Sequence, residues 1–284
     1  MKQKQSKRRE IKKYIPEFII GFTLLTILIS FILIYLIDLQ NFAGIRDVLF
    51  DLDQRYFFFE FHPFIFHNWY RNGGIAEIFQ WLFLGISALI SAYIAGKKQG
   101  KQHRVCLFWG IMATAFMFML IEDAGDPRHT IRSYVQAVYQ EPIQGTMGSI
   151  TEFIYFSVLA FIPTFALLKY GRVLSEVPQS LFYTISGFLF YALATTLSFL
   201  GDAINLYHRA GGFLYDLLLQ LGDNKLAVIW QNYNTRQGWG FIEFFLMDSL
   251  LEEVLELLGA AALLAATLTF LLNYWGQPEE VNRQ

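Results

Sequence analysis

Long apolar runs alternate with short polar or basic stretches along almost the whole chain. Six of these runs are long enough to cross the hydrocarbon core of a bilayer, which takes roughly 20 helical residues. The pattern therefore predicts an all-α, polytopic transmembrane helical bundle that forms a single domain over residues 1–284. The expected spans lie near residues 18–37, 78–96, 105–121, 153–168, 179–200 and 244–275.

The basic residues gather at one side of these predicted spans. A basic tail, residues 1–16, precedes the first span; Lys97 and Lys98 follow the second, and Lys169 and Arg172 follow the fourth. Because cytoplasmic loops carry an excess of Lys and Arg, both termini are expected in the cytoplasm and the bundle in the cell (inner) membrane. The first apolar run exceeds the roughly 7–15 residues of a signal-peptide core, which indicates an uncleaved span.

Three segments, residues 38–77, 122–152 and 201–243, are then expected on the outer side. The first carries a dense, irregular aromatic patch, and the third contains an amphipathic piece near residues 213–221. Both patterns are typical of segments that lie in the headgroup layer. Trp230 and Trp239 are accordingly predicted to anchor the third segment at the membrane interface.

Composition supports the membrane class and excludes several chemistries. Hydrophobic residues make up 55% of the chain and charged residues only 16%, which is unusual for a soluble domain. The single cysteine, Cys106, rules out an intrachain disulfide or a cysteine-based metal cluster. The net charge of −2 and the basic residues confined to loops give no reason to expect a nucleic-acid partner.

Acidic residues far apart in sequence are brought to the outer boundary by this topology. Glu122, Asp126 and His129 follow one another at i, i+4 and i+7, and Glu252 and Glu256 at i and i+4. Carboxylates and imidazole on facing helices can bind one or two hard or borderline divalent metal ions. These five residues are the predicted ligands of a metal ion whose identity the sequence leaves open.

Two features of the acids favour a functional interpretation. Asp248, Glu252 and Glu256 form a stripe of like charge, in which each pair costs roughly 0.2–0.5 kcal/mol unless a cation intervenes. Glu122 lies at the C-terminal end of an outward-running helix, where the helix dipole disfavours anions. The residues expected to act as charge partners or structural members of the site are Asp123, Arg128, Arg132, Asp248 and Glu253.

Simpler interpretations exist for several of these residues. Asp126 and Pro127 are typical of a helix start, with Gly125 closing the preceding helix. Ser149 and Glu152 fit a capping box before the fourth span. The acids before the sixth span would be solvated at a helix N-terminus, where carboxylates are favoured. Small residues after Glu256, from Gly259 to Ala266, suit close helix packing.

Three functions therefore remain open. A divalent cation site could serve an enzyme that acts on a lipid or lipid-linked substrate, or could hold the outer face together. The same acids could carry protons or cations across the membrane, although the inner halves of the spans offer few polar side chains. Alternatively, the acids form structural ion pairs in an accessory subunit that binds a membrane-protein partner or a second copy of itself. Whether the protein is an enzyme is not decided by the sequence.

Overall fold

The computed structural model describes residues 14–55, 64–71, 73–98, 102–140, 146–203, 206–238 and 240–275. These residues form helices and contain no strand, which confirms the all-α prediction. Six helical segments within them are long and apolar enough to cross a membrane. The six are Ile15–Leu39, Ile65–Lys98, His103–Gly125, Ile150–Tyr170, Pro178–Gly201 and Phe241–Asn273.

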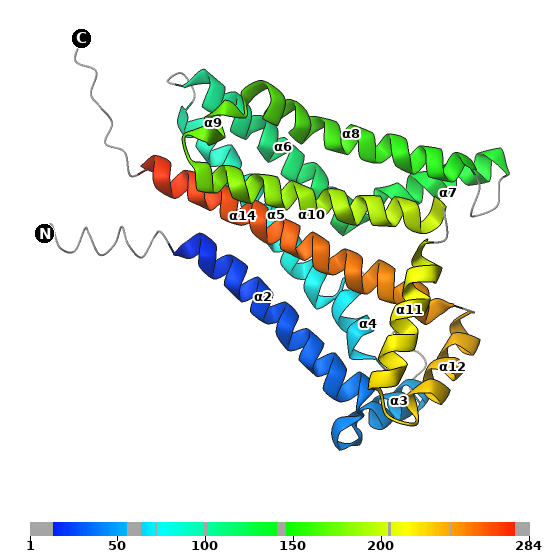
Figure 1. Cartoon of the computed structure of the whole chain (residues 1–284). Helices are drawn as coiled ribbons and strands as arrows, with labels where there is room; N and C mark the ends of the chain where they lie inside the picture. Colours follow the sequence, from blue (N-terminus) through cyan, green and yellow to red (C-terminus); the bar gives the residue numbers. More distant parts are fainter. Residues whose placement is uncertain are drawn as a thin grey trace, which may run out of the picture.

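The long helices form the bundle and the short ones connect them (Figure 1). The long elements are α2 (Ile15–Leu33) with its π-helical continuation η1 (Ile34–Leu39), α5 (Ile75–Lys98), α6 (His103–Gly125), α8 (Thr146–Tyr170), α10 (Pro178–Ala203), and α13 (Phe241–Phe245) with η3 (Leu246–Glu252) and α14 (Glu253–Trp275). The short elements are η2 (Phe42–Gly44), α3 (Ile45–Arg55), α4 (Ile65–Tyr70), α7 (Pro127–Tyr139), α9 (Arg172–Ser175), α11 (Leu206–Leu221) and α12 (Leu226–Gln237).

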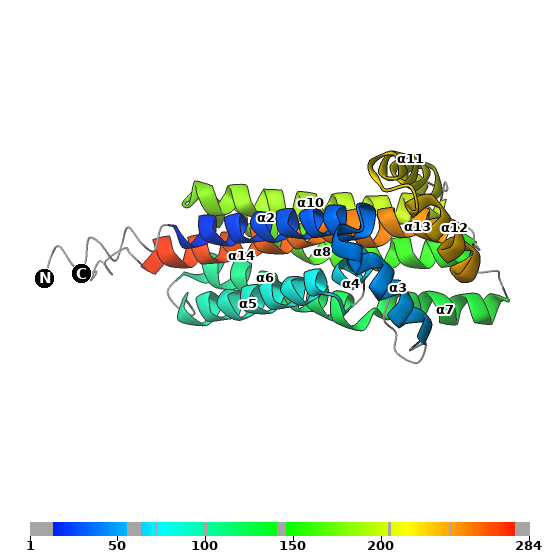
Figure 2. The ribbon, with the colours of Figure 1, turned by 90° about the horizontal axis from the view of Figure 1, so that it is seen from below.

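Successive long helices run in alternating directions. The start of α2 and the end of α14 therefore lie at the same end of the bundle, which we call the inner end (Figures 1 and 2). The short helices α3, α7, α11 and α12 lie at the opposite end, called the outer end. This arrangement agrees with an even number of spans, as the positions of the basic residues predicted.

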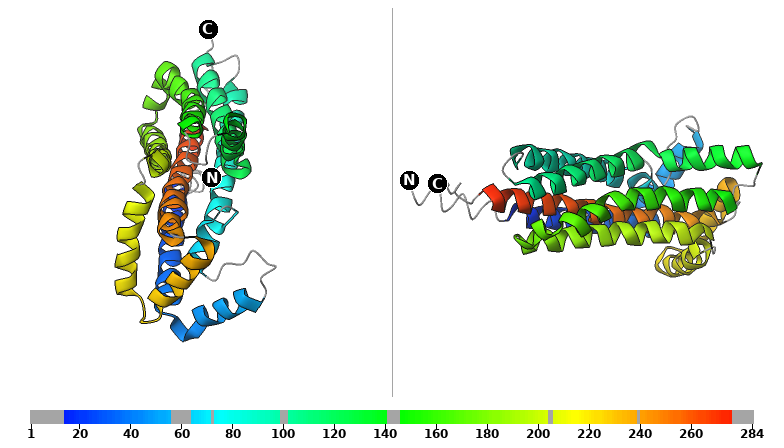
Figure 3. Two further views of the ribbon diagram at one scale, coloured as in Figure 1. Left: turned by 90° about the vertical axis from the view of Figure 1, so that its right-hand side faces the viewer. Right: turned by 90° about the horizontal axis from the view of Figure 1, so that it is seen from above.

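Helix α14 lies at the centre of the bundle, packed against α2, α5 and α10 (Figure 3). Its small-residue face is buried, so the expected close packing occurs within the bundle. One close approach joins Gly259 of α14 to Gly187 of α10. A Cβ at Gly259 would lie 2.7 Å from the Tyr191 ring and 3.1 Å from the Gly187 carbonyl oxygen. Only a hydrogen at Gly259 allows the two helices to approach this closely.

Several aromatic residues of the outer segments are core residues, which corrects their interpretation as interfacial anchors, while residues 56–63 of the aromatic patch lie outside the described residues. Phe64, Phe66 and Tyr70 are buried, and helix α4 extends the second span well before residue 78. Trp230 is fully buried, with its ring 5.1 Å from that of Tyr215; Trp239 lies outside the described residues. The short helices fold over the outer end of the bundle, so these rings pack against one another.

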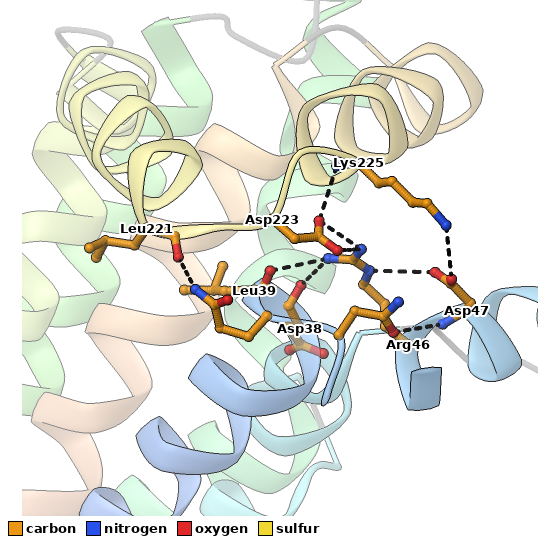
Figure 4. Close-up of polar contacts among 9 residues, drawn as sticks. Asp38, Leu39, Arg46, Asp47, Leu221, Asp223 and Lys225 are labelled. Carbon is orange, nitrogen blue, oxygen red and sulfur yellow. Dashed lines mark hydrogen bonds and ion pairs between the residues drawn. The ribbon is translucent and has the colours of Figure 1, made fainter. Parts of the chain in front are cut away.

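A buried charge network links the short helices to the end of the first span (Figure 4). The fully buried Arg46 of α3 donates hydrogen bonds to the Asp38 carbonyl oxygen at 2.9 Å and to both carboxylate oxygens of Asp223 at 2.9 and 2.7 Å. The Asp38 carboxylate accepts hydrogen bonds from the backbone N–H groups of Ile65 and Phe66, each at 2.9 Å. We call this set the outer charge network.

Local structure around the predicted helix ends differs in one respect from the expectation. Helix α6 ends at Gly125 and α7 begins at Pro127, as predicted, with Asp126 between them in the left-handed region at φ 45°. Helix α8, however, is already formed at Thr146, so Ser149 is inside the helix and the capping box is wrong. Glu152 is buried and forms an ion pair with Arg132 at 2.8 Å.

Candidate functional site

Six carboxylates from three segments of the bundle interact electrostatically near the outer end. Asp123 interacts with Glu77, Glu122 and Glu252, and Glu256 interacts with Asp123, Glu77 and Glu122. We call these residues the acidic cluster. It consists of Glu77 of α5, Glu122 and Asp123 of α6, Glu252 of η3, and Glu253 and Glu256 of α14.

Two side chains and one backbone N–H group donate hydrogen bonds to three of these acids. The Tyr207 hydroxyl donates to Glu252 Oε2 at 2.5 Å, and Gln80 Nε2 donates to Glu253 Oε2 at 2.8 Å. The Gly73 backbone N–H donates to Glu77. Burial and the adjacent Glu252 carboxylate raise the pKa of Tyr207, which keeps its hydroxyl protonated as a donor. Glu77 and Glu252 are only 5% and 9% exposed, so they are not the solvated acids of the simpler interpretation.

The π-helical turn of η3 changes the predicted charge stripe. A π-helix inserts an extra residue per turn and occurs frequently at functional sites. Because η3 ends at Glu252, Asp248 and Glu252 are separated by π-helical rather than α-helical geometry. Glu252 is thereby turned toward Tyr207, while still interacting electrostatically with Asp248 and Glu256.

Arg128 of α7 is the basic residue that reaches into this region. Its Nε lies 3.5 Å from Glu122 Oε1, and its Nη1 donates to Ser198 Oγ of α10 at 3.3 Å. The guanidinium carbon lies 4.8 Å from the centre of the Phe156 ring of α8. Burial opposes its charge, but the Glu252 and Glu122 carboxylates raise the pKa of Arg128 and keep it positive. Arg128 thus connects α6, α8 and α10 beside the acids.

A cleft of about 520 Å³ borders the acidic cluster. It lies between α6, α8, α10 and α14, and most of its wall is apolar. The polar part of the wall includes Glu122, Asp123, Glu256 and Tyr191. Asp123 Oδ2 and the Tyr191 hydroxyl are buried and have no hydrogen-bond partner within the described residues. Both atoms can therefore form a hydrogen bond to a group outside the described residues.

The five predicted metal ligands fall into two adjacent groups. Glu122, Glu252 and Glu256 belong to the acidic cluster. Asp126 and His129 lie nearer the surface, where Asp126 Oδ1 and His129 Nδ1 are 2.5 Å apart and both side chains are about half exposed. Among the described residues, no group of three or more His, Cys, Asp or Glu side chains is arranged to hold a metal ion. A ready-made coordination shell is therefore not present in this part of the chain, and metal binding stays a prediction.

The predicted charge partners have different roles. Asp123 and Glu253 are members of the acidic cluster, and Arg128 faces it. Arg132 instead pairs with Glu152 between α7 and α8. Asp248 lies beside the cluster and interacts with Glu252. The hydrogen bond between His129 and Asp126 raises the pKa of His129; despite the opposing effect of burial, it also lowers the pKa of Asp126.

Sequence reasoning missed Glu77, Tyr191 and Tyr207 as members of this site. Glu77 stands alone just before the predicted second span, at the outer boundary, so the topology that gathered the other acids also applies to it. Tyr191 lies in the middle of an apolar span and Tyr207 in an outer segment, where a single tyrosine carries no signal. Their positions depend on how α10 and α11 pack against α14.

The arrangement combines an excess of carboxylates, one arginine and an apolar cleft. Comparison of the chain with protein-family models, with curated proteins and with solved structures found no match.

Proposed function

We propose that the acidic cluster binds a divalent cation, and that the bound ion serves a lipid or lipid-linked substrate at the outer side of the cell membrane. The observation that supports this is the charge imbalance: six carboxylates, of which Glu77 and Glu252 are buried and the others partly buried, interact with one another. Among the described residues, the guanidinium of Arg128 is a positive group beside them. Buried charges are costly unless ions or protons neutralise them. Oxygen ligands of this kind suit hard ions such as Mg²⁺, Ca²⁺ or Mn²⁺.

The members of the cluster that line the cleft are the proposed ligands. Glu122, Asp123 and Glu256 border the cleft, where an ion could also contact water or a substrate oxygen. Asp123 Oδ2 offers an oxygen that the described residues leave without a hydrogen bond. Magnesium commonly binds through one or two carboxylates and retains several waters, so such a site does not require a closed protein shell.

The proposed orientation follows from the basic residues. Lys97, Lys98, Lys169 and Arg172 belong to α5, α8 and α9, at or near their inner ends, where α2 also begins. The positive-inside rule then assigns the inner end to the cytoplasm and the acidic cluster to the outer half of the membrane.

Transport across the membrane receives less support. Two of the buried hydroxyls toward the inner end, Ser87 of α5 and Thr267 of α14, bond to carbonyl oxygens of their own helices. These hydroxyls pack between helices and do not extend the acidic cluster toward the inner end. An ion held at the cluster without movement across the bilayer fits this arrangement better.

Metal analysis combined with thermal unfolding tests the proposal. The full chain, purified in mild detergent, should contain a stoichiometric divalent metal, and chelation by EDTA should lower its unfolding temperature. Re-addition of Mn²⁺ at a hundredfold excess over its Kd should restore about 2.7 kcal/mol of stability. Glu122→Gln and Glu256→Gln should weaken this response, whereas Asp216→Asn, which changes an exposed acid of α11, should not. Absence of metal and of any ion-dependent stability in all four proteins would overturn the proposal.

A further inference from the structure

We propose that the cleft between α8 and α10 binds the hydrocarbon chain of a membrane lipid whose head group carries a phosphate. The chain-binding part follows from the cleft itself. The phosphate part rests on the proposed function, because a cation is needed between the phosphate and the acidic cluster.

The cleft has the length that a lipid chain requires. Its α8 wall extends from Phe153 to Leu167 and its α10 wall from Phe188 to Leu200. Fourteen helical steps of 1.5 Å make the α8 wall about 21 Å long. One leaflet contributes about half of a hydrocarbon core of roughly 30 Å, so the cleft can accommodate a chain extended through one leaflet.

The surroundings of the cleft favour entry from the lipid phase. Val158 and Phe161 of α8 and Leu193 of α10 are exposed apolar side chains on the two helices that form it. Large exposed apolar surfaces on helices of membrane length contact lipid in a bilayer. A chain can therefore move sideways from the bilayer into the cleft without crossing water, which suits an occupant already dissolved in the membrane.

The polar end of the cleft determines the head group. The Tyr191 hydroxyl lacks a partner within the described residues and can donate to a phosphate oxygen. Arg128 contacts Phe156, which lines the cleft, and its guanidinium can also donate to phosphate. Glu122, Asp123 and Glu256 would repel a phosphate, so a divalent ion shared between them and the head group is required.

Photo-labelling with a defined pair of probes tests the inference. The probes are a long-chain alkyl monophosphate with a diazirine in its chain and the corresponding alcohol, applied to the full chain in lipid nanodiscs with Mn²⁺. Labelling by the phosphate should map to peptides of α8 and α10 that line the cleft. Ala160→Trp and Ala192→Trp, which fill the cleft from either wall, should reduce it about tenfold, equivalent to about 1.4 kcal/mol of binding free energy.

Val158→Trp is the matched control, because Val158 is exposed on α8 and lies outside the cleft lining. Labelling that survives in this variant, falls in the two filled variants and is favoured by the phosphate over the alcohol would support the inference. Equal labelling of all three variants, or no preference for the phosphate, would overturn it. Cleft labelling by the phosphate that persists unchanged in EDTA would contradict the proposed cation while leaving the chain site intact.

Discussion

The outer charge network and the acidic cluster both place charged side chains in the protein interior, but the first pairs opposite charges, whereas the second gathers mainly like charges. Arg46 is surrounded by two carbonyl oxygens and the Asp223 carboxylate, and Asp38 accepts two backbone hydrogen bonds. In the acidic cluster, Tyr207, Gln80 and the Gly73 N–H donate to three of the carboxylates, but the carboxylates still interact mainly with other negative charges. Loss of one partner from a buried pair of opposite charges is costly, whereas an excess of like charge is relieved by bound protons or cations.

The comparison predicts opposite effects of charge removal in the two regions. Removal of the Arg46 charge leaves the buried Asp38 and the 26% exposed Asp223 side chain without their positive partner. Removal of a carboxylate from the acidic cluster reduces repulsion and costs little, but it removes a proposed ligand. Substitutions in the outer charge network should therefore lower stability, whereas substitutions in the acidic cluster should lower the response to divalent ions.

The largest effect is expected for Arg46→Met. Loss of one partner of a buried ion pair typically costs about 3–5 kcal/mol, because the remaining charge stays desolvated. Unfolding in detergent, followed by circular dichroism, should show this loss. Lys225→Met is the control, because Lys225 is exposed and pairs with Asp47 at 3.6 Å across the surface. A loss below about 1 kcal/mol for Arg46→Met would place this network among weak surface pairs.

Gly259→Leu should have the next largest effect. Its side chain would overlap the Tyr191 ring and the α10 backbone near Gly187, and overpacking typically costs about 1–3 kcal/mol. Displacement of Tyr191 should also weaken ion binding. Gly21→Leu in α2 is the control, because it makes the same substitution in a helix at a position where nothing lies within 4 Å of an added Cβ. Equal thermal stability of the two variants would contradict the close approach of α10 and α14.

Asp123→Asn should raise stability when no divalent ion is present. Relief of repulsion from three like-charged neighbours, at roughly 0.2–0.5 kcal/mol each, gives a gain of about 1 kcal/mol. The same variant should lose most of the stabilisation by Mn²⁺. Unfolding midpoints in EDTA and in Mn²⁺ measure both quantities. Destabilisation in EDTA would show that Asp123 is a structural partner like Asp223.

The smallest effect concerns the pair of His129 and Asp126. The raised pKa of His129 stabilises the fold below its ordinary value of 6.5, and this contribution is lost as pH rises through the raised value. The lowered pKa of Asp126 stabilises the fold above 3.8. Between pH 3.8 and pH 6.5 the charged His129 and the charged Asp126 both stabilise the fold. Two neighbouring charges also act on His129: the Glu152 carboxylate favours its charged form, and the Arg128 guanidinium opposes it.

His129→Gln should therefore lower stability at about pH 5.5 by less than about 1 kcal/mol, because the pair is half exposed, and should change little at about pH 9. A pH series of thermal unfolding curves for the wild type and this variant measures the difference. A larger loss of stability at the higher pH than at the lower one would contradict a raised pKa for His129.

The apolar runs were sufficient to predict the six helical segments that are long and apolar enough to cross a membrane, because such a helix is a local property of about 20 residues. They also brought Glu122, Asp123, Glu252 and Glu256 to one level of the bundle. The burial of side chains in the outer segments was not predictable. The sequence predicted Trp230 as an interface anchor, but α12 buries this side chain at the outer end of the bundle. The π-helical turn of η3 and the contact of Tyr207 with Glu252 depend on tertiary packing, which no sequence spacing records.

The cation site in the acidic cluster can be tested by electron paramagnetic resonance, which measures Mn²⁺ binding to the metal-depleted full chain. We predict stoichiometric binding by the wild type and by Asp216→Asn, with at least about tenfold weaker binding by the double variant Asp123→Asn, Glu256→Gln. Binding of equal strength in all three proteins, or no binding in any of them, would contradict a cation site in the acidic cluster.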